Sequence, residues 1–184
     1  DTSLEFYIML KFPLKKTRNS KSYAEEYLST LSEVSKKIDF NIIEKLSKLI
    51  SRYYLSNKNI FVCGNGGSAS ISNHFICDHL KGISTNTNLL PKIFSLSSSL
   101  EVITAVANDI KYDEIFSFQL SRLAKKGDCL ITISSSGNSE NIIKAIKWGK
   151  KNKLKTVSLN GFDGGRAKKI SDISINVPCN NYGI

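Results

Sequence analysis

A run of hydroxyl side chains in the second half of the sequence has the composition of a phosphate-binding loop. The run, Ser134-Ser135-Ser136-Gly137-Asn138-Ser139, follows an apolar stretch that predicts a buried strand and precedes a stretch with helical spacing. Backbone N–H groups and serine hydroxyls would then converge at a helix N-terminus, where the helix dipole favours an anion. Because the run contains no Lys or Arg, hydrogen bonds rather than a point charge would hold the ligand. These residues therefore predict a site for a small phosphorylated molecule.

A second loop, earlier in the sequence, has the same organisation. Gly64-Asn65-Gly66-Gly67-Ser68 follows the short apolar run 59–63 and enters a predicted helix near Ala69. Either loop alone is explained equally well as a turn with a helix cap, because Ser, Gly and Asn are common in both. Two such loops at one edge of a sheet favour a phosphate site.

Two nucleotide-binding alternatives fit the sequence less well. Residues 64–69 match the loose dinucleotide pattern G-x-G-x-x-G/A. A dinucleotide site also needs an acidic residue near the end of the second strand, and residues 93–97 contain none. No Gly-Lys-Ser/Thr follows either loop, which argues against a nucleoside-triphosphate site. We therefore expect a sugar phosphate as ligand and no nucleotide cofactor.

The composition favours a single soluble domain. A chain of 184 residues, of which 41% are hydrophobic, buries one sizeable core but hardly two. No apolar run approaches the roughly 18 residues of a membrane span, so we expect no membrane association. The four cysteines lack C-x-x-C spacing, which favours reduced thiols and a cytoplasmic location. The net charge of +10 is dispersed along the chain, so we do not expect nucleic acid as a partner.

Alternating helical and extended patterns predict an α/β fold. Two amphipathic helices, over 23–38 and 40–53, precede the first strand. The predicted strands cover 59–63, 92–96, 129–134, 155–159 and 172–177, and the remaining helices cover 69–81, 99–106, 113–123, 140–151 and 165–170. This order predicts parallel strands with right-handed crossovers and a ligand at their carboxyl ends. We expect a basic solvated arm over 1–20, in which residues 1–8 precede the native start at Met9, and a single domain over 21–184.

Five ordered motifs make the chain recognisable. They are residues 63–69, His74-Phe75, Ala107-Asn108-Asp109, residues 134–139 and residues 161–165. From about Tyr23 to Ile184 the sequence resembles the sugar isomerase (SIS) domain family and, within it, the phosphoheptose isomerases. The resemblance implies a three-layer α-β-α sandwich with a five-stranded parallel sheet. It also implies isomerisation of sedoheptulose 7-phosphate to a manno-heptose 7-phosphate, for bacterial lipopolysaccharide or capsule heptose, by a homo-oligomer, a dimer or tetramer, packed through the two N-terminal helices.

The resemblance assigns roles to individual positions. The residues that match the family's substrate-binding positions are Asn65, Gly66, Gly67, Ser68, Asn108, Asp109, Ser134, Ser135, Ser136 and Ser139. His74 matches a zinc ligand of some members. Asp78 stands where the family has a glutamate that serves as metal ligand and catalytic base.

Aldose–ketose isomerisation needs a base that moves a proton between C1 and C2 through an enediol. Asp78 is the natural candidate, and it shares a helix face with His74 at spacing i, i+4, so that the two side chains would grip one metal or one substrate. His79 is the only other histidine and is the alternative catalytic acid or base. The sequence leaves the choice between Asp78 and His79 open.

The sequence also departs from the family pattern. Aspartate is one methylene shorter than the family's glutamate, and residue 184 falls where the family continues into a C-terminal helix that carries a glutamine and a histidine. We expect the domain to lack that helix and any zinc site to be incomplete in this chain. Two alternatives stay open: a non-catalytic SIS module that binds a phosphosugar or a replication initiator protein, and an isomerase of another sugar phosphate.

Overall fold

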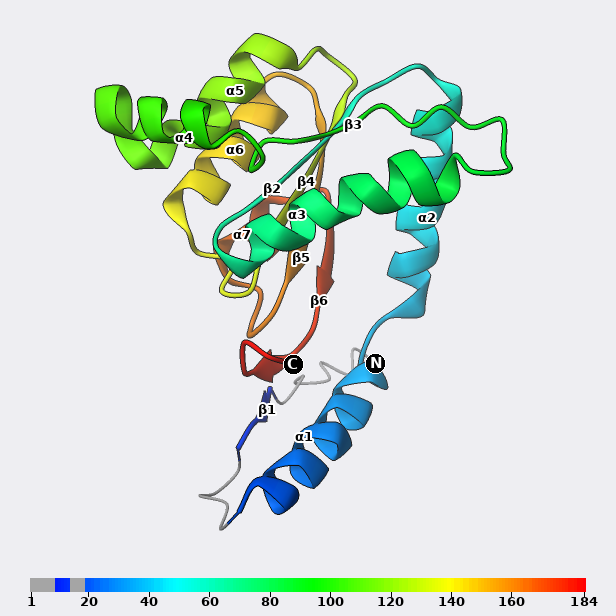
Figure 1. Ribbon diagram of the computed structural model, residues 1–184, viewed down its shortest axis with the longest axis vertical. Helices are drawn as coiled ribbons and strands as arrows, with labels where there is room; N and C mark the ends of the chain where they lie inside the picture. Colours follow the sequence, from blue (N-terminus) through cyan, green and yellow to red (C-terminus); the bar gives the residue numbers. More distant parts are fainter. Residues whose placement is uncertain (1–8, 14–18) are drawn as a thin grey trace, which may run out of the picture.

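The computed structural model describes residues 9–13 and 19–184 of the chain. Its centre is a five-stranded parallel sheet in the order β3-β2-β4-β5-β6 (Figure 1). The strands are β2 (Ile60–Gly64), β3 (Ile93–Ser95), β4 (Cys129–Ser134), β5 (Lys155–Asn160) and β6 (Ile173–Asn176). The five-stranded parallel sheet predicted from the sequence is confirmed.

Helices connect consecutive strands and precede the first of them. They are α1 (Ser20–Ser35), α2 (Phe40–Leu55), α3 (Gly67–Cys77), α4 (Leu100–Val106), α5 (Ile115–Leu123), α6 (Glu140–Lys151) and α7 (Gly165–Ile170). Side-chain oxygens of Asn19 and Asp39 accept hydrogen bonds at the starts of α1 and α2, as N-cap residues do. The two predicted N-terminal helices are therefore confirmed.

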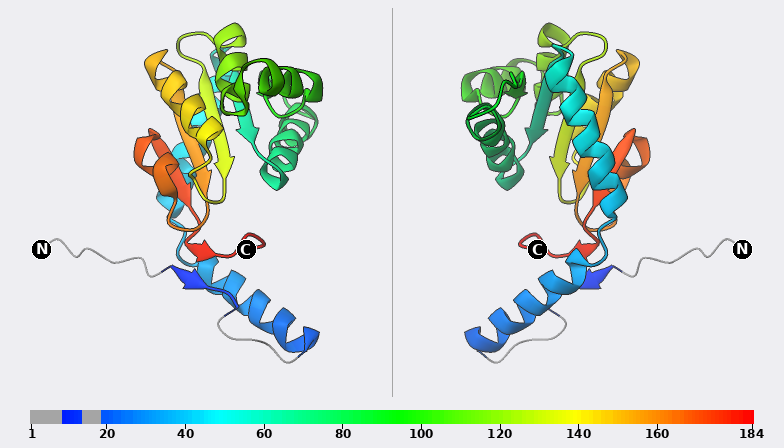
Figure 2. Two further views of the ribbon diagram at one scale, coloured as in Figure 1. Left: turned by 90° about the vertical axis from the view of Figure 1, so that its left-hand side faces the viewer. Right: turned by 90° about the vertical axis from the view of Figure 1, so that its right-hand side faces the viewer.

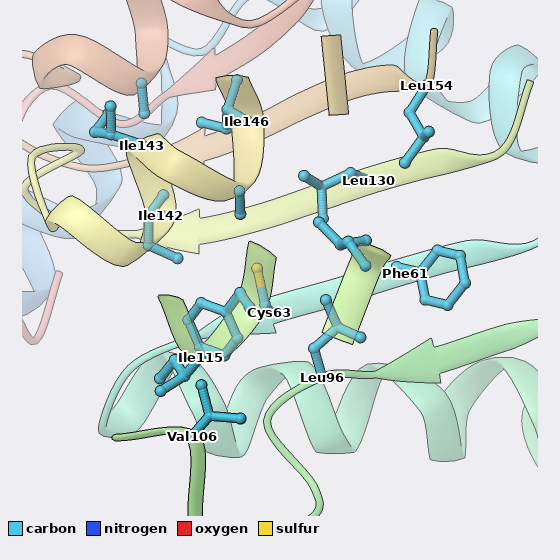
Figure 3. Packing of buried hydrophobic residues seen from close by; sticks show 14 residues of the cluster. Phe61, Cys63, Leu96, Val106, Ile115, Leu130, Ile142, Ile143, Ile146 and Leu154 are labelled. Atoms are coloured by element: carbon cyan, nitrogen blue, oxygen red, sulfur yellow. The ribbon is translucent and has the colours of Figure 1, made fainter. Parts of the chain in front are cut away.

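The two faces of the sheet carry separate hydrophobic cores. Successive strand residues point to opposite faces, so Phe61 and Cys63 lie on one side of β2 while Ile60 and Val62 lie on the other. The first face packs against α4 to α7, where residues such as Ile142 contact the strands (Figure 3). The second face packs against α2 and α3. These layers confirm the predicted three-layer α-β-α sandwich.

The predicted solvated arm is wrong where the structure describes it. Leu10–Lys11 forms the short strand β1, which pairs in parallel with β7 (Cys179–Asn180). Phe12 is buried against Val34 of α1 and Cys179, because burial of its aromatic ring outweighs the polar character of the segment. The remainder of the predicted arm, residues 1–8 and 14–18, lies outside the described residues. Together β1, β7 and α1 form an extension below the sheet (Figures 1 and 2).

One helix widens where the sequence predicts regular helix, and another continues as a π-helix beyond its predicted end at 106. The helix predicted over 69–81 is α-helical only to Cys77 and continues as a π-helix, η1 (Asp78–Ile83). In the same way α4 continues into the π-helix η2 (Ala107–Lys111), which is followed by a 3₁₀ turn, η3 (Tyr112–Glu114). A π turn rotates the following side chains relative to an α-helix, and such turns occur frequently at functional sites. Both π-helices begin at or just before candidate site residues, Asp78 and Asn108.

The strand order places a topological switch point between β2 and β4. These strands are direct neighbours, with Gly64 paired to Ile133, and the chain leaves them toward opposite faces of the sheet. In open parallel sheets the crevice at such a point, outside the carboxyl ends of the strands, is where ligands bind. None of the helices in the described ranges is long and apolar enough to cross a membrane.

At the other edge of the sheet, the buried carboxylate of Asp128 links the amino-terminal ends of β2 and β4. It accepts hydrogen bonds from the backbone N–H groups of Asn59 (3.0 Å) and Lys125 (2.8 Å), and from the Asn59 side chain (3.3 Å). We expect Asp128→Ala to lower the free energy of unfolding by about 2–4 kcal/mol, because three donors lose their acceptor. Urea unfolding measures this loss, and Glu25→Ala, an exposed carboxylate on α1, is the control, with a change below about 0.5 kcal/mol. Equal stability of the two variants would contradict this account.

Candidate active site

A cavity of about 440 Å³ lies at the carboxyl ends of β2 and β4. Its volume is in the range of small-molecule sites. The residues that line it are Asn65, Gly67, Ser68, Ile71, Ile133, Ser134, Ser135, Ser136, Ser139 and Tyr182. All four serines of the predicted phosphate cradle are among them, and so are three of the four candidates from the glycine-rich loop. The two loops thus share one edge of the sheet, as the sequence predicts.

The serine loop is folded on itself. The N–H group of Gly137 donates to the carbonyl oxygen and the hydroxyl of Ser134 (3.1 and 3.2 Å), and the N–H group of Asn138 donates to the hydroxyl of Ser136 (3.2 Å). Ser139 immediately precedes α6, a 12-residue helix whose N-terminus therefore meets the cavity. Serine hydroxyls and the positive end of the helix dipole converge there, which is the chemistry of an anion site.

A second turn holds the serine loop from behind. Residues 161–165 form this turn, and the Gly161 N–H group donates to the Ser135 carbonyl oxygen (2.9 Å). Gly137 has φ +62°, and a Cβ atom there would lie 2.0 Å from the carbonyl oxygen of Gly164. The glycines therefore let two backbone turns touch.

Two cations on the helices that flank the serine loop, Lys144 on α6 and Arg166 on α7, are paired with carboxylates. Arg166 contacts Glu140 at 2.7 Å and Lys144 contacts Glu114 at 2.6 Å. A hydrogen bond from Arg166 lowers the pKa of Glu140, and a hydrogen bond from Lys144 lowers the pKa of Glu114. Neither cation lines the cavity. The lining is thus formed by neutral groups, in agreement with an anion held by hydrogen bonds.

The glycine-rich loop reaches the cavity through part of its residues. Asn65, Gly67 and Ser68 line it, whereas Gly66, at φ +55°, is exposed outside the lining. A Cβ atom on Gly64 would lie 2.6 Å from the backbone of Ser68, so the strand must enter α3 through a glycine.

Asn108 and Asp109 lie outside the cavity lining. Both are exposed on η2, where the Asn108 side-chain amide donates to the Asp109 carboxylate at 2.8 Å. The structure therefore keeps this pair together on the surface, near the start of η2 and a few residues before Tyr112.

His74 and Asp78 share a helix face, as the sequence predicts. His74 Nε2 lies 3.3 Å from Asp78 Oδ1, and both side chains are exposed, at 74% and 62%. One stripe of α3 and its continuation contains, at helical spacing, Gly67, Ile71, His74 and Asp78. The first two of these residues line the cavity. The pair therefore lies on the stripe that leads out of the cavity, about 10–16 Å along the helix axis from Gly67 at a rise of 1.5 Å per residue.

The structure places His79 away from the cavity. Its imidazole is buried, contacts the Tyr54 hydroxyl through Nδ1, and stacks on Phe75 with ring centroids 4.1 Å apart. Burial lowers the pKa of His79, and the charge of Asp78 opposes this shift only in part. This core position on the α2 side is the ordinary role of a histidine on an apolar face, and it argues against His79 as the catalytic acid or base.

Sequence reasoning missed three contributors to the site. Tyr182 lines the cavity and packs edge-on against Phe162, with ring centroids 5.0 Å apart. No pattern in the sequence singles it out. Ile71 lies on the same helical stripe as Gly67, so helical spacing in the sequence could have identified it. Asn141, buried beneath the glycine-rich loop, forms a reciprocal pair with Asn65.

Residues 22–161 match the model of the SIS domain family, and the chain belongs to this family. Its relatives include the phosphoheptose isomerases of Aliarcobacter butzleri, 38% identical over 85% of this chain and 84% of the relative, and of Helicobacter pylori strain 26695, 39% identical over 86% and 78%. Among solved structures it is similar to phosphoheptose isomerase GmhA from Neisseria gonorrhoeae, with a TM-score of 0.78, 29% identity, and coverage of 89% and 87%. Within the SIS domain proteins, the chain is therefore a member of the phosphoheptose isomerase family.

The contact between the two glycine turns gives a direct prediction about the serine loop. We expect Gly137→Ala to lower the free energy of unfolding by at least about 3 kcal/mol, because it combines positive-φ strain with a backbone clash. Gly127→Ala is the matched control: it shares the positive φ but meets only the end of the Lys58 side chain, and should lose only about 1 kcal/mol. Denaturant melts of both variants measure the difference. An equal loss would show that the two turns do not need their close contact.

Proposed function

We propose that this chain interconverts sedoheptulose 7-phosphate and a manno-heptose 7-phosphate by proton transfer between C1 and C2 through an enediol. The observation that carries the proposal is the serine-lined cavity at the switch point, together with phosphoheptose isomerases as relatives over most of the chain. Ser134, Ser135, Ser136 and Ser139 bind the phosphate, and the sugar extends from the cavity along α3. Such a product would supply bacterial heptose for a surface polysaccharide.

Asp78 is the base in this proposal. The isomerising carbons lie at the opposite end of the substrate from the phosphate, and the Asp78 carboxylate lies on the stripe of α3 that leaves the phosphate end. His74, beside it, orients the carboxylate when neutral or pairs with it when protonated. The wider π turn that begins at Asp78 rotates the side chains that follow, whereas Asp78 itself keeps its place on the α3 stripe beside His74.

Zinc is a conditional part of the proposal. An imidazole nitrogen and a carboxylate oxygen are zinc ligands, and His74 and Asp78 are close enough to contact one ion. No group of three candidate ligands occurs within the described residues, so further ligands would have to come from elsewhere. Bound there, zinc would polarise the substrate carbonyl as a Lewis acid.

We also propose that the chain acts as a cytoplasmic homo-oligomer. Leu28 of α1 and Phe40 of α2 are 63% and 69% exposed, and Tyr23, Leu31 and Ile43 add to this apolar surface. Large exposed side chains on adjacent helices mark an interaction surface. The exposure of His74 and Asp78 supports the same proposal, because a second subunit would exclude water from the reacting groups. All four cysteines are free thiols, which supports a reducing compartment.

The activity is tested with a panel of phosphosugars. Purified protein is incubated with sedoheptulose 7-phosphate, fructose 6-phosphate and ribulose 5-phosphate, and aldose formation is followed by chromatography. The proposal predicts conversion of the heptose alone or at much the highest kcat/KM. Preference for a hexose or pentose phosphate would assign a different substrate, and binding of phosphosugar without any conversion would indicate a non-catalytic module.

Replacement of Asp78 tests the base. We expect Asp78→Asn to lower kcat by about 10²- to 10⁴-fold with little change in KM, because a base is lost while the phosphate site remains. Asp78→Glu, which restores the family's residue, should retain activity. Asp163→Asn, an exposed substitution of the same chemistry in the supporting turn, is the control. Wild-type kcat in Asp78→Asn would exclude Asp78 as the base.

A charge introduced into the apolar surface of α1 tests the proposed assembly. We expect Leu28→Glu to shift the sedimentation mass toward the monomer, because a buried charge opposes packing of the helices. Ser29→Glu adds the same charge at the neighbouring exposed position and should keep the wild-type mass. An unchanged mass in Leu28→Glu, or a monomeric wild type, would contradict the proposal.

A further inference from the structure

The side chain of Asn65 in the cavity is held by a hydrogen-bond network whose direction can be worked out. The Asn65 amide nitrogen donates to Asn141 Oδ1 (2.9 Å), and the Asn141 amide nitrogen donates to Asn65 Oδ1 (3.0 Å). The Tyr112 hydroxyl contacts the same Asn65 oxygen at 3.1 Å. Three segments far apart in the sequence thus meet at one amide: the glycine-rich loop, the 3₁₀ turn η3 and the start of α6.

One backbone group fixes the polarity of the whole network. The N–H group of Ile142 lies 2.9 Å from Asn141 Oδ1, and a backbone N–H can only donate. This atom of Asn141 is therefore the oxygen, and its nitrogen must face Asn65. The atom of Asn65 that faces this nitrogen is in turn an oxygen. Tyr112 donates to the same oxygen, whose two lone pairs are then both used.

The amide nitrogen of Asn65 carries two hydrogens, and the network uses one of them. The second has no acceptor among the described residues, while Asn65 lines the cavity beside the serine loop. Asn141 itself is 2% exposed and is absent from the lining. It therefore acts on a ligand only through Asn65.

We propose that Asn141 is a positioning residue, supported by Tyr112, which holds Asn65 so that it presents an N–H donor, and not its carbonyl oxygen, to the phosphate end of the substrate. The identity of that ligand rests on the proposed function. A freely rotating Asn65 would present donor and acceptor alternately, and an acceptor facing a phosphate oxygen is repulsive. In a cavity lined by neutral groups, a donor of fixed direction replaces part of what a lysine would supply.

The matched test removes Asn141 in two backgrounds. In the otherwise unchanged protein, we expect Asn141→Leu to weaken inorganic phosphate binding, measured by calorimetry, about 10-fold. The KM for sedoheptulose 7-phosphate should rise by a similar factor, and kcat should stay within about threefold, because the contact is made equally in ground and transition states. In an Asn65→Ala background the same substitution should have no further effect on phosphate affinity.

Tyr112→Phe provides a second variant that keeps the fold, because the Tyr112 side chain is exposed and loses only its hydroxyl. We expect a loss of about threefold in phosphate affinity, again absent in the Asn65→Ala background. Asn152→Leu, at the exposed other end of α6, is the control and should bind phosphate as the wild type does.

Equal losses in both backgrounds would show that Asn141 merely stabilises the start of α6, and no loss in either would show that Asn65 needs no positioning; both results overturn the inference. A wild type that binds phosphate through this network yet converts no heptose phosphate would support the inference while overturning the proposed function.

Discussion

The parallel pairing of β2 with β4 is the constraint on which the rest of the structure depends. It places the carboxyl ends of two buried strands side by side, and the chain must leave them toward opposite faces because each face carries its own helices. The crevice between the diverging loops follows from this topology rather than from any one residue. Its chemistry then depends on which side chains occupy the first positions after each strand. Here they are Asn65 after β2 and Ser135 after β4.

The proposed phosphate site has a neutral lining and needs rigid geometry, which the structure supplies through backbone contacts. Serine hydroxyls and N–H groups bind an anion well only when they converge, since each alone contributes little against water. The contact of Gly137 with Gly164 and the Gly161 hydrogen bond fix the serine loop from outside the cavity. The Asn65–Asn141 pair fixes the opposite loop to the same helix start. Both loops are therefore anchored at the N-terminus of α6, where the helix dipole favours an anion.

Much of the architecture could be predicted from the sequence, because apolar runs and helical spacing report burial directly. The five strands are within one residue of their predicted ends, and the serine loop follows β4 as expected. Hydropathy gives no signal for β1 and β7, which are two residues each and pair across almost the whole chain. Likewise, a π turn leaves no periodic signal in so short a stretch, so the rotation that accompanies the burial of His79 could not be foreseen.

The site itself was predictable only where composition carries the chemistry. The serines and glycines of the two loops predicted most of the residues that line the cavity, whereas Tyr182 and Asn141 reach the site through positions that only the folded chain creates. The pairing of His74 with Asp78 was predictable from their spacing. Their exposure was not, because it depends on which faces of the molecule remain uncovered.

The most direct test of the account is to incubate the protein with sedoheptulose 7-phosphate in heavy water and to follow the C1 and C2 proton signals by NMR. An enediol mechanism predicts that an aldose appears and that deuterium from the solvent replaces the proton that moves between C1 and C2. An aldose that forms without any deuterium, under conditions where the base exchanges with solvent, would contradict the enediol. The absence of both exchange and aldose, with the phosphosugar visibly bound, would contradict the assignment as an isomerase of this sugar.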